Sequence, residues 1–245
     1  MIEIRDLSFT YENSGENVLK DFNLTISEGE FVCIIGHSGC GKSTLIHLLA
    51  GLEKPTRGSI RIDGQRMEGP GTDRAVVFQN YTLFPWMTVR KNIIFAAMKT
   101  GRFSKEEAGR RADMFLHKTG LSAHEKKYPF QLSGGMRQRA AIAKALAMDS
   151  EIFLFDEPFG ALDLQNRKEL QQLLQKLCRE QTKTVVFVTH DLDEALTLGQ
   201  RILFIKDGTI AKDLDITERI NDCCAHALKY EDCQTLKKSL EAWFQ

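Results

Sequence analysis

The sequence predicts an α/β fold in which a mixed sheet is flanked by helices, and three observations support this. An apolar run at residues 31–35 passes through a glycine-rich turn into a helix-like run at 45–50. Continuous apolar or β-branched runs at 152–155 and 184–189 are typical of buried parallel strands. Residues 81–150 carry mainly helical patterns. We therefore expect a helical subdomain inserted into an α/β frame.

Periodicity and turn signals place the elements in order, beginning with an N-terminal antiparallel β part. Strands, with their turns, are expected at residues 2–10, 18–26, 59–64, 74–79, 151–155, 184–189, 201–206 and 209–212. Helices are expected at residues 89–99, 105–119, 133–148, 164–181 and 192–198, and the remainder to 245 is expected to be mostly helical. One domain then spans 1–245, with a core at 1–80 and 151–215, a helical subdomain at 81–150 and a tail at 216–245.

The glycine-rich turn carries the complete pattern G-x-x-x-x-G-K-[ST]. Its residues are Gly36, His37, Ser38, Gly39, Cys40, Gly41, Lys42, Ser43 and Thr44. The glycines let backbone N–H groups converge on a phosphate, and the following helix directs its positive end to the same point. Lys42 can reach the β- and γ-phosphates, and the Ser43 hydroxyl can ligate Mg²⁺. This favours a P-loop NTPase core over a turn that binds nothing.

Two adjacent acids, Asp156 and Glu157, follow the apolar run at 152–155. The carboxyl ends of parallel strands form the edge where ligands bind. Asp156 would hold Mg²⁺, directly or through water, and Glu157 would face the γ-phosphate and polarise the attacking water. The alternative, a strand that ends in solvated acids, is disfavoured beside a phosphate loop.

Three further candidates carry weaker signals when taken alone. Gln79 ends a strand and can reach into a site at the sheet edge, or it is a solvated strand end. His190 ends another strand and is the right type to touch a γ-phosphate oxygen, although a lone histidine there is more often structural. Tyr11 could stack on a purine base, or it is an ordinary aromatic at a strand end.

Two stretches in the helical part are unusual. Ser133 is a good N-cap, and Gly134 and Gly135 leave the first turn of a helix uncovered. Such a turn suits close approach of a phosphate, and a flexible junction is the alternative. The run Phe84-Pro85-Trp86 is too apolar for a free loop, so it is either packed within its own subdomain or meets a partner.

Composition narrows the class of protein. Charged residues make up 27% of the chain and balance to +0, so there is no electrostatic case for nucleic acid as the main partner. No apolar run reaches the roughly 18 residues of a membrane span, and the start lacks a signal-peptide pattern. We expect a soluble chain, or one attached to a membrane through partners. Scattered cysteines indicate reduced, intracellular thiols, and those at 223, 224 and 233 fit no zinc pattern.

Cys40 is the one cysteine expected to be reactive. It lies inside the glycine-rich turn, beside Lys42 and the start of a helix. Both neighbours favour the thiolate form of a cysteine. We therefore expect alkylation of Cys40 to inactivate the protein and bound nucleotide to slow the reaction.

The combined motifs resemble the ATP-binding subunit of ABC transporters over nearly the whole chain. The matching features are the phosphate loop, Gln79, the turn 132–135, the run 155–157, the run 161–163 and His190, in that order. The runs 78–80, 83–86 and 132–136 look like the importer subunits for nitrate, alkanesulfonates and taurine. Met136 and Gly160 depart from the wider family, where glutamine and serine are common, but both departures occur in this importer group.

The resemblance implies a role for each candidate around ATP and Mg²⁺. One subunit would supply its phosphate loop, Gln79, Asp156, Glu157 and His190, with Gln79 among the magnesium ligands and Tyr11 stacked on adenine. A second copy would bring Ser133, Gly134 and Gly135 to the same γ-phosphate, and Asp163 would lie at the dimer seam. ATP would then close a head-to-tail homodimer and hydrolysis would release it.

The same resemblance implies the partners. Two integral-membrane permeases would bind the dimer at the cytoplasmic face of the cell's inner membrane, with residues 79–87 in the groove for a permease helix. A separate solute-binding protein would act through the permease, and nucleic acid is not an expected partner. The alternatives are an ATPase of an exporter or lipoprotein-release system, a non-transport ABC ATPase and a catalytically dead module. The identity of the solute cannot be predicted from this chain.

Overall fold

The computed structural model describes residues 1–12, 15–79, 83–160, 162, 164–180 and 182–217. Its main sheet has six strands in the order β10-β9-β3-β8-β7-β6. The strands are β3 (Phe31–Gly36), β6 (Arg74–Val77), β7 (Ile152–Asp156), β8 (Thr184–Val188), β9 (Arg201–Lys206) and β10 (Thr209–Asp215). All neighbours pair in parallel except β10, which runs antiparallel to β9, so the sheet is mixed as expected.

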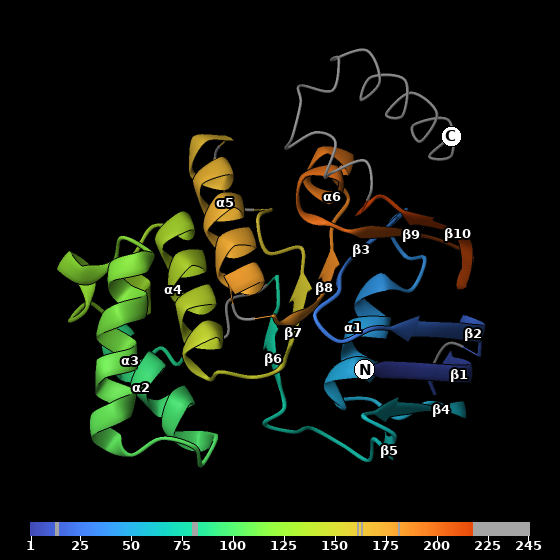
Figure 1. Ribbon diagram of the computed structural model, residues 1–245, viewed down its shortest axis with the longest axis horizontal. Coiled ribbons are helices and arrows are strands. Elements are labelled where there is room, and N and C mark those ends of the chain that lie inside the picture. The colour runs from blue at the N-terminus through green and yellow to red at the C-terminus, as the bar shows by residue number, and fades with distance from the viewer. Residues whose placement is uncertain (13–14, 80–82, 161, 163, 181, 218–245) are drawn as a thin grey trace.

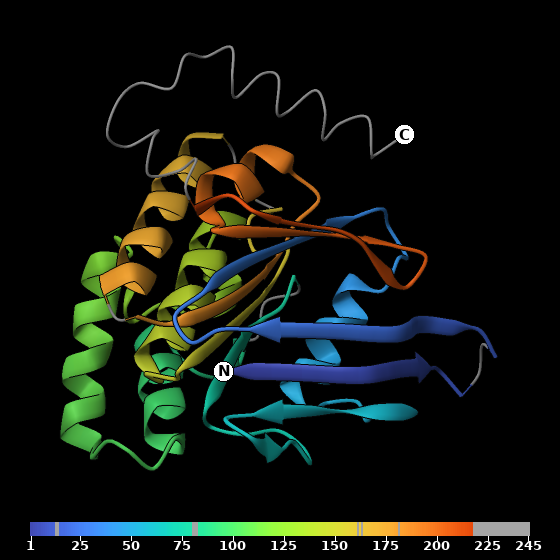
Figure 2. The ribbon, with the colours of Figure 1, turned by 45° about the vertical axis from the view of Figure 1, so that its right-hand side comes forward.

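The second sheet is antiparallel and has the order β2-β1-β4-β5. Its strands are β1 (Ile2–Thr10), β2 (Asn17–Ile26), β4 (Arg57–Ile62) and β5 (Gln65–Arg66). Figure 2 shows β1, β2 and β4 side by side. Helix α1 (Lys42–Ala50) packs its buried side chains against both sheets, because Leu45 and Leu48 share one apolar core with Phe22 and Ile34. The N-terminal sheet therefore supports the helix that follows the phosphate loop.

The two faces of the main sheet pack against different helices. Side chains alternate along a strand, so Val32 and Ile34 face α1 while Phe31 and Cys33 face a second core. That core also holds residues of α5 (Leu164–Glu180) and α6 (Leu192–Leu198). The main sheet is therefore buried on both faces, which explains its nearly continuous apolar strands.

The helical part comprises α2 (Val89–Lys99), α3 (Lys105–Lys118) and α4 (Gly134–Ala147), with short turns η1 (Ser122–His124) and η2 (Pro129–Gln131). In Figure 1 these helices lie together on the left, beside the main sheet. The expected capping box is present, since Ser104 and Glu107 exchange backbone and side-chain hydrogen bonds at the start of α3. Apolar residues of α2, α3 and α4 join the same core as α5.

Several strand ends differ from those expected, and the short strand β5 was not expected. β6 stops at Val77, where its pairing with Phe155 of β7 ends, so Gln79 lies beyond the strand. β10 continues to Asp215, because its antiparallel pairing with β9 extends back to Arg201. The tail expected from 218 onward lies outside the described residues, and so do its cysteines. Within the described ranges, no helix combines the length and apolar character needed to cross a membrane.

Candidate nucleotide-binding site

The parallel strands bring the candidate residues to one edge of the main sheet. β3 leads directly into the phosphate loop, and its neighbour β8 ends two residues before His190. β7 ends in Asp156 and is followed by Glu157, and β6 ends two residues before Gln79. These strands are parallel neighbours, so their carboxyl ends meet at the same edge. Four segments far apart in the sequence therefore converge around the phosphate loop.

The phosphate loop is shaped by close backbone packing. Gly39 and Gly41 have positive φ angles of 82° and 105°, a conformation that glycine adopts without strain. A Cβ on Gly36 would lie 2.3 Å from the carbonyl oxygen of Ile205. His37 and Ser38 remain exposed at the top of the loop, ahead of the first turn of α1. The exposed backbone and the following helix N-terminus together suit an anion.

Lys42 lies under this loop with only 6% of its surface exposed. Its Nζ donates hydrogen bonds to the carbonyl oxygens of Gly36 at 2.8 Å and His37 at 2.9 Å. These partners are neutral, so they solvate the ammonium group but do not neutralise its charge. A phosphate at the loop would supply the missing negative charge.

Ser43 and Asp156 form the part of the site that fits a magnesium ion. The Ser43 hydroxyl donates to Asp156 Oδ1 at 3.1 Å. Burial raises the pKa of the Asp156 carboxyl above its usual value, and the hydrogen bond from Ser43 opposes this rise. A hydroxyl and a carboxylate that meet at one point are hard oxygen ligands of the kind Mg²⁺ prefers. Gln79 lies at the same edge with an exposed side chain.

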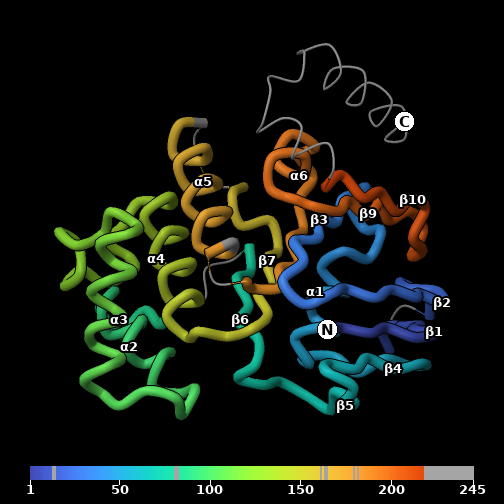
Figure 3. The backbone as a smooth tube through the Cα atoms, in the orientation of Figure 1, coloured from blue at the N-terminus to red at the C-terminus, as the bar shows by residue number. Residues whose placement is uncertain are grey.

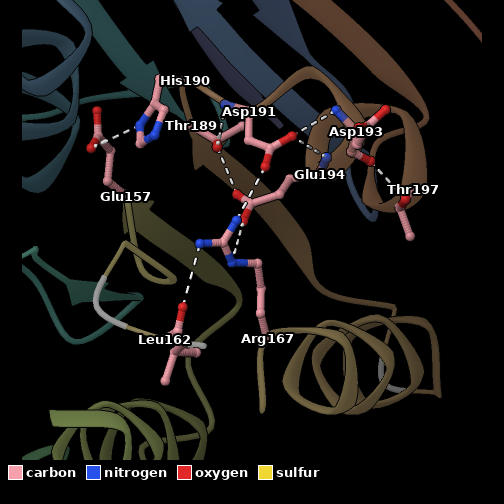
Figure 4. A network of polar contacts seen from close by, with 9 residues as sticks. All are labelled: Glu157, Leu162, Arg167, Thr189, His190, Asp191, Asp193, Glu194 and Thr197. Atoms are coloured by element: carbon pink, nitrogen blue, oxygen red, sulfur yellow. Dashed lines mark hydrogen bonds and ion pairs between the residues drawn. The ribbon is translucent and has the colours of Figure 1, made fainter. Parts of the chain in front are cut away.

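Glu157 and His190 face each other across the edge, as Figure 4 shows. His190 Nδ1 lies 3.2 Å from Glu157 Oε2, and the two side chains are 66% and 23% exposed. Glu157 has a positive φ of 47°, which is uncommon for a residue with a side chain. Its amide donates to the carbonyl oxygen of Val188 at 3.0 Å and so ties it to the end of β8. The pair is thus fixed at its base and open to solvent at its tip.

Tyr11 reaches the first turn of α1 from the end of β1. Its hydroxyl lies 3.2 Å from Thr44 Oγ1, within hydrogen-bond distance. Its ring packs edge-on against Phe9 with centroids 4.8 Å apart. Tyr11 is also among the exposed large side chains of the protein. A partly exposed aromatic residue therefore stands beside the first turn of α1, which follows the phosphate loop.

The predicted site residues Ser133, Gly134 and Gly135 lie at the start of α4. Ser133 caps α4 by accepting a hydrogen bond from the Met136 amide at 3.3 Å, and it is exposed. Figures 1 and 3 show α4 and α1 on opposite sides of β6 and β7, and the two helices contribute to different apolar cores. Asp163 lies outside the described residues.

The expectation that the surroundings of Cys40 favour its thiolate form is wrong, whereas its alkylation and the protection by nucleotide stay predictions. Cys40 is buried, and its burial raises the pKa of the thiol above the usual value. The nearby charge of Lys42 lowers the pKa, but by less than burial raises it. The Cys40 side chain is buried, and its position in the loop alone did not predict this burial.

Sequence reasoning also missed a polar network behind His190. Asp191 caps α6, because its Oδ1 accepts hydrogen bonds from the amides of Asp193 at 2.9 Å and Glu194 at 3.3 Å. An aspartate followed at the third position by glutamate is a recognisable cap signal. Arg167, which pairs with Asp191 and Glu194, had no local signal because its partners lie in another segment.

The phosphate loop between β3 and α1 and the parallel strands beside it are those of a P-loop NTPase fold, and comparison with known proteins identifies the family. Residues 19–160, more than half of the chain, match the family described as ABC transporter. The protein therefore belongs to the ABC transporter family.

Similar proteins include two from cyanobacteria. The bicarbonate transport ATP-binding protein CmpC of Synechococcus elongatus is 47% identical over 215 residues, which cover 86% of this chain and 32% of that protein. This chain thus spans about a third of the length of that relative. The nitrate import ATP-binding protein NrtD of a Synechocystis species is 45% identical over 219 residues, covering 88% of this chain and 82% of the relative.

A solved structure of similar fold is the dimeric, post-hydrolysis state of the ATP-binding cassette MJ0796 bound to ADP and Pi. It is 38% identical to this chain and superimposes with a TM-score of 0.81. The match covers 88% of this chain and 99% of that one.

Proposed function

We propose that this protein is the ATP-hydrolysing subunit of an ABC importer and that two copies close around two molecules of Mg-ATP. The observation that carries the proposal is the pairing of Glu157 with His190 beside a phosphate loop that already holds a lysine under it. The similar proteins are named for bicarbonate transport and nitrate import, which supports a small solute of that kind as the transported molecule. Sulfonates and taurine are the other candidates.

Binding would begin at the phosphate loop. The Lys42 ammonium would exchange part of its carbonyl contacts for β- and γ-phosphate oxygens, while loop amides and the start of α1 take the others. The exposed ring face of Tyr11 would stack on adenine, since its hydroxyl is already placed against Thr44.

Hydrolysis would then depend on the Glu157–His190 pair. Glu157 accepts a proton from a water molecule while the oxygen of that water bonds to the γ-phosphorus. The bond between the γ-phosphorus and the β–γ bridging oxygen breaks at the same time, which leaves ADP and phosphate. His190 holds the Glu157 carboxylate and contacts a γ-phosphate oxygen. Ser43, Asp156 and Gln79 would hold the magnesium ion, which neutralises charge on the phosphate oxygens when bound.

The exposed start of α4 would serve the second copy of the chain. Ser133 is exposed, and the first turn carries two glycines, so a phosphate can approach the amides there. This turn begins a helix on the other side of β6 and β7 from α1, and a head-to-tail dimer would place it on the other subunit's γ-phosphate. Asp163 would lie at the seam between the copies. The dimeric form of the MJ0796 cassette supports the formation of a dimer.

The helical subdomain at 81–150 would dock on two membrane permeases and place the dimer at the cytoplasmic face of the membrane, with a solute-binding protein on the other side. Trp86 is 69% exposed, so burial within its own subdomain is ruled out for this side chain. The ring centroids of Trp86 and Phe84 are 5.4 Å apart, and those of Phe84 and Phe95 are 5.2 Å apart. A fixed and exposed aromatic ring suits an apolar helix of a partner.

Replacing Trp86 with alanine is expected to abolish capture of the permease from membranes and leave the basal ATPase unchanged. The reason is that Trp86 is exposed and its ring packs against Phe84, which lies in the helical subdomain. Affinity purification of the complex, followed by an ATPase assay, measures both effects. Leu52→Ala, another exposed apolar side chain, is the matched control. Normal permease capture by Trp86→Ala would contradict the docking proposal.

Replacing His190 with alanine is expected to lower turnover by roughly 10²-fold or more, as for loss of a group that positions a general base. Thermal unfolding should change little, because the side chain is largely exposed and its contact is with Glu157. Steady-state ATPase rates and melting temperatures test this. A loss of stability that accounts for the whole loss of rate would make His190 a structural residue.

A further inference from the structure

Arg167 stands one turn into α5 and joins two segments of the nucleotide edge, as Figure 4 shows. Its Nη1 donates to Asp191 Oδ2 at 3.2 Å. Its Nη2 donates to the carbonyl oxygen of Leu162 at 3.4 Å. Its Nε lies 3.6 Å from Glu194 Oε1, which is close enough for an ion pair but too long for a hydrogen bond. One guanidinium group therefore links α5, the segment before it and the start of α6.

The segment 189–191 is fixed from several sides. Thr189 Oγ1 donates to Glu194 Oε2 at 2.6 Å and accepts from the amide of Asp191 at 3.0 Å. The Thr189 amide donates to the carbonyl oxygen of Ile34 in β3. His190, between these two residues, is the only member of the three whose side chain turns toward Glu157 in Figure 4. The position of its ring thus follows from contacts made by its neighbours.

Charge makes the arginine necessary to this arrangement. Glu194 has only 6% of its side chain exposed, and burial raises the pKa of its carboxyl. The hydrogen bond from Thr189 and the charge of Arg167 oppose that rise, whereas the negative charge of Asp191 adds to it. Without Arg167, the Asp191 and Glu194 carboxylates would lose the guanidinium group that now pairs with both of them. Repulsion would then loosen the segment that carries His190.

The other end of the link reaches the start of α4. Leu162, whose carbonyl oxygen Arg167 holds, is buried and precedes Asp163 in the sequence. A Cβ on Gly135 would lie 3.0 Å from Leu162 Cδ2, so the leucine packs tightly on the first turn of α4. Arg167 therefore touches the backbone of a segment that itself touches the Ser133 turn.

We propose that Arg167 is a positioning residue for hydrolysis. It holds the 189–191 segment at a fixed position relative to Leu162 and so keeps the His190 side chain in contact with Glu157. This rests on the proposed role of His190. Arg167 acts through His190 and does not itself contact the nucleotide. Lysine could not replace it, because a single ammonium group cannot reach acceptors on two segments in the fixed geometry of a guanidinium.

The test is a double-mutant cycle of Arg167→Gln and His190→Ala on the full chain. Arg167→Gln is expected to lower kcat roughly 10-fold to 100-fold with little change in KM, because a misplaced group slows the chemical step. The double variant is expected to turn over as slowly as His190→Ala alone, within about twofold. Arg167→Lys should restore only part of the loss.

Arg201→Gln is the matched control for stability. Arg201 is about as exposed as Arg167, at 22% against 25%, and pairs with Asp213 and Glu30. It lies at the start of β9, at the opposite edge of the main sheet from the phosphate loop. Arg201→Gln should lower the melting temperature about as much as Arg167→Gln does, while kcat stays normal.

Three results would overturn the inference. One is a normal kcat in Arg167→Gln. Another is a double variant whose loss of kcat equals the product of the two single losses, although His190→Ala alone is slow. Unchanged turnover in His190→Ala would instead overturn the proposed role of His190, and the inference with it. Should Arg167→Gln fail to fold, Asp191→Asn keeps the cap oxygen but removes the charge that Arg167 meets, and the same outcomes apply to it.

Discussion

Glu157→Gln is expected to bind Mg-ATP and form a stable dimer while turning over at roughly 10²-fold to 10⁴-fold below the normal rate, the range that a general base contributes. The amide is nearly the same size as the carboxylate and can still meet His190, but it cannot accept the proton of the attacking water. Binding groups elsewhere on the edge, such as Lys42 and Ser43, are untouched.

Two measurements on the purified variant test this expectation. Phosphate release gives the turnover, and size-exclusion chromatography with light scattering gives the mass with and without Mg-ATP. The normal protein should dimerise only transiently, because hydrolysis removes the γ-phosphate that joins the copies. A variant that hydrolyses ATP normally would exclude Glu157 as the base, and one that stays monomeric with Mg-ATP would contradict the dimer proposal.

Lys42→Ala is expected to weaken ATP binding by roughly 10²-fold to 10⁴-fold. Hydrogen bonds to charged groups contribute about 1.5–3 kcal/mol each, and the ammonium group would make two of them to phosphate oxygens. The substitution also leaves the carbonyl oxygens of Gly36 and His37 without the donor that now satisfies them. Titration with a fluorescent ATP analogue measures the affinity.

Lys42→Met separates the two effects of that change. Methionine keeps most of the buried volume of the lysine stem but carries no charge. If Met and Ala variants lose affinity alike while only the alanine variant unfolds at lower temperature, charge explains binding and packing explains stability. Unchanged affinity in both variants would remove Lys42 from the phosphate site.

The sequence predicted those parts of the site that depend on a local pattern. The strand, loop and helix around Lys42 and the two acids at the end of the β7 strand follow from glycines and apolar runs, and the structure has these elements close to where they were expected. Parallel pairing then brings Asp156 and His190 to the same edge without further information.

Properties that depend on packing between distant segments could not be predicted in this way. The pKa of Cys40 is set by burial under the loop, which outweighs the lysine and the helix start seen in the sequence. The exposure of Trp86 depends on how the helices around it pack. Arg167 reads as one charge among many on an amphipathic helix until α6 is placed beside it.

The left-handed backbone at Glu157 has a consequence for its neighbour Asp156. In an extended chain two adjacent acids point to opposite faces, and in a regular helix they diverge by about 100°. Here the turn at Glu157 directs one carboxylate to Ser43 and the other to His190. The two adjacent carboxylates thus have different partners, which is what the proposed division between a magnesium ligand and a general base requires.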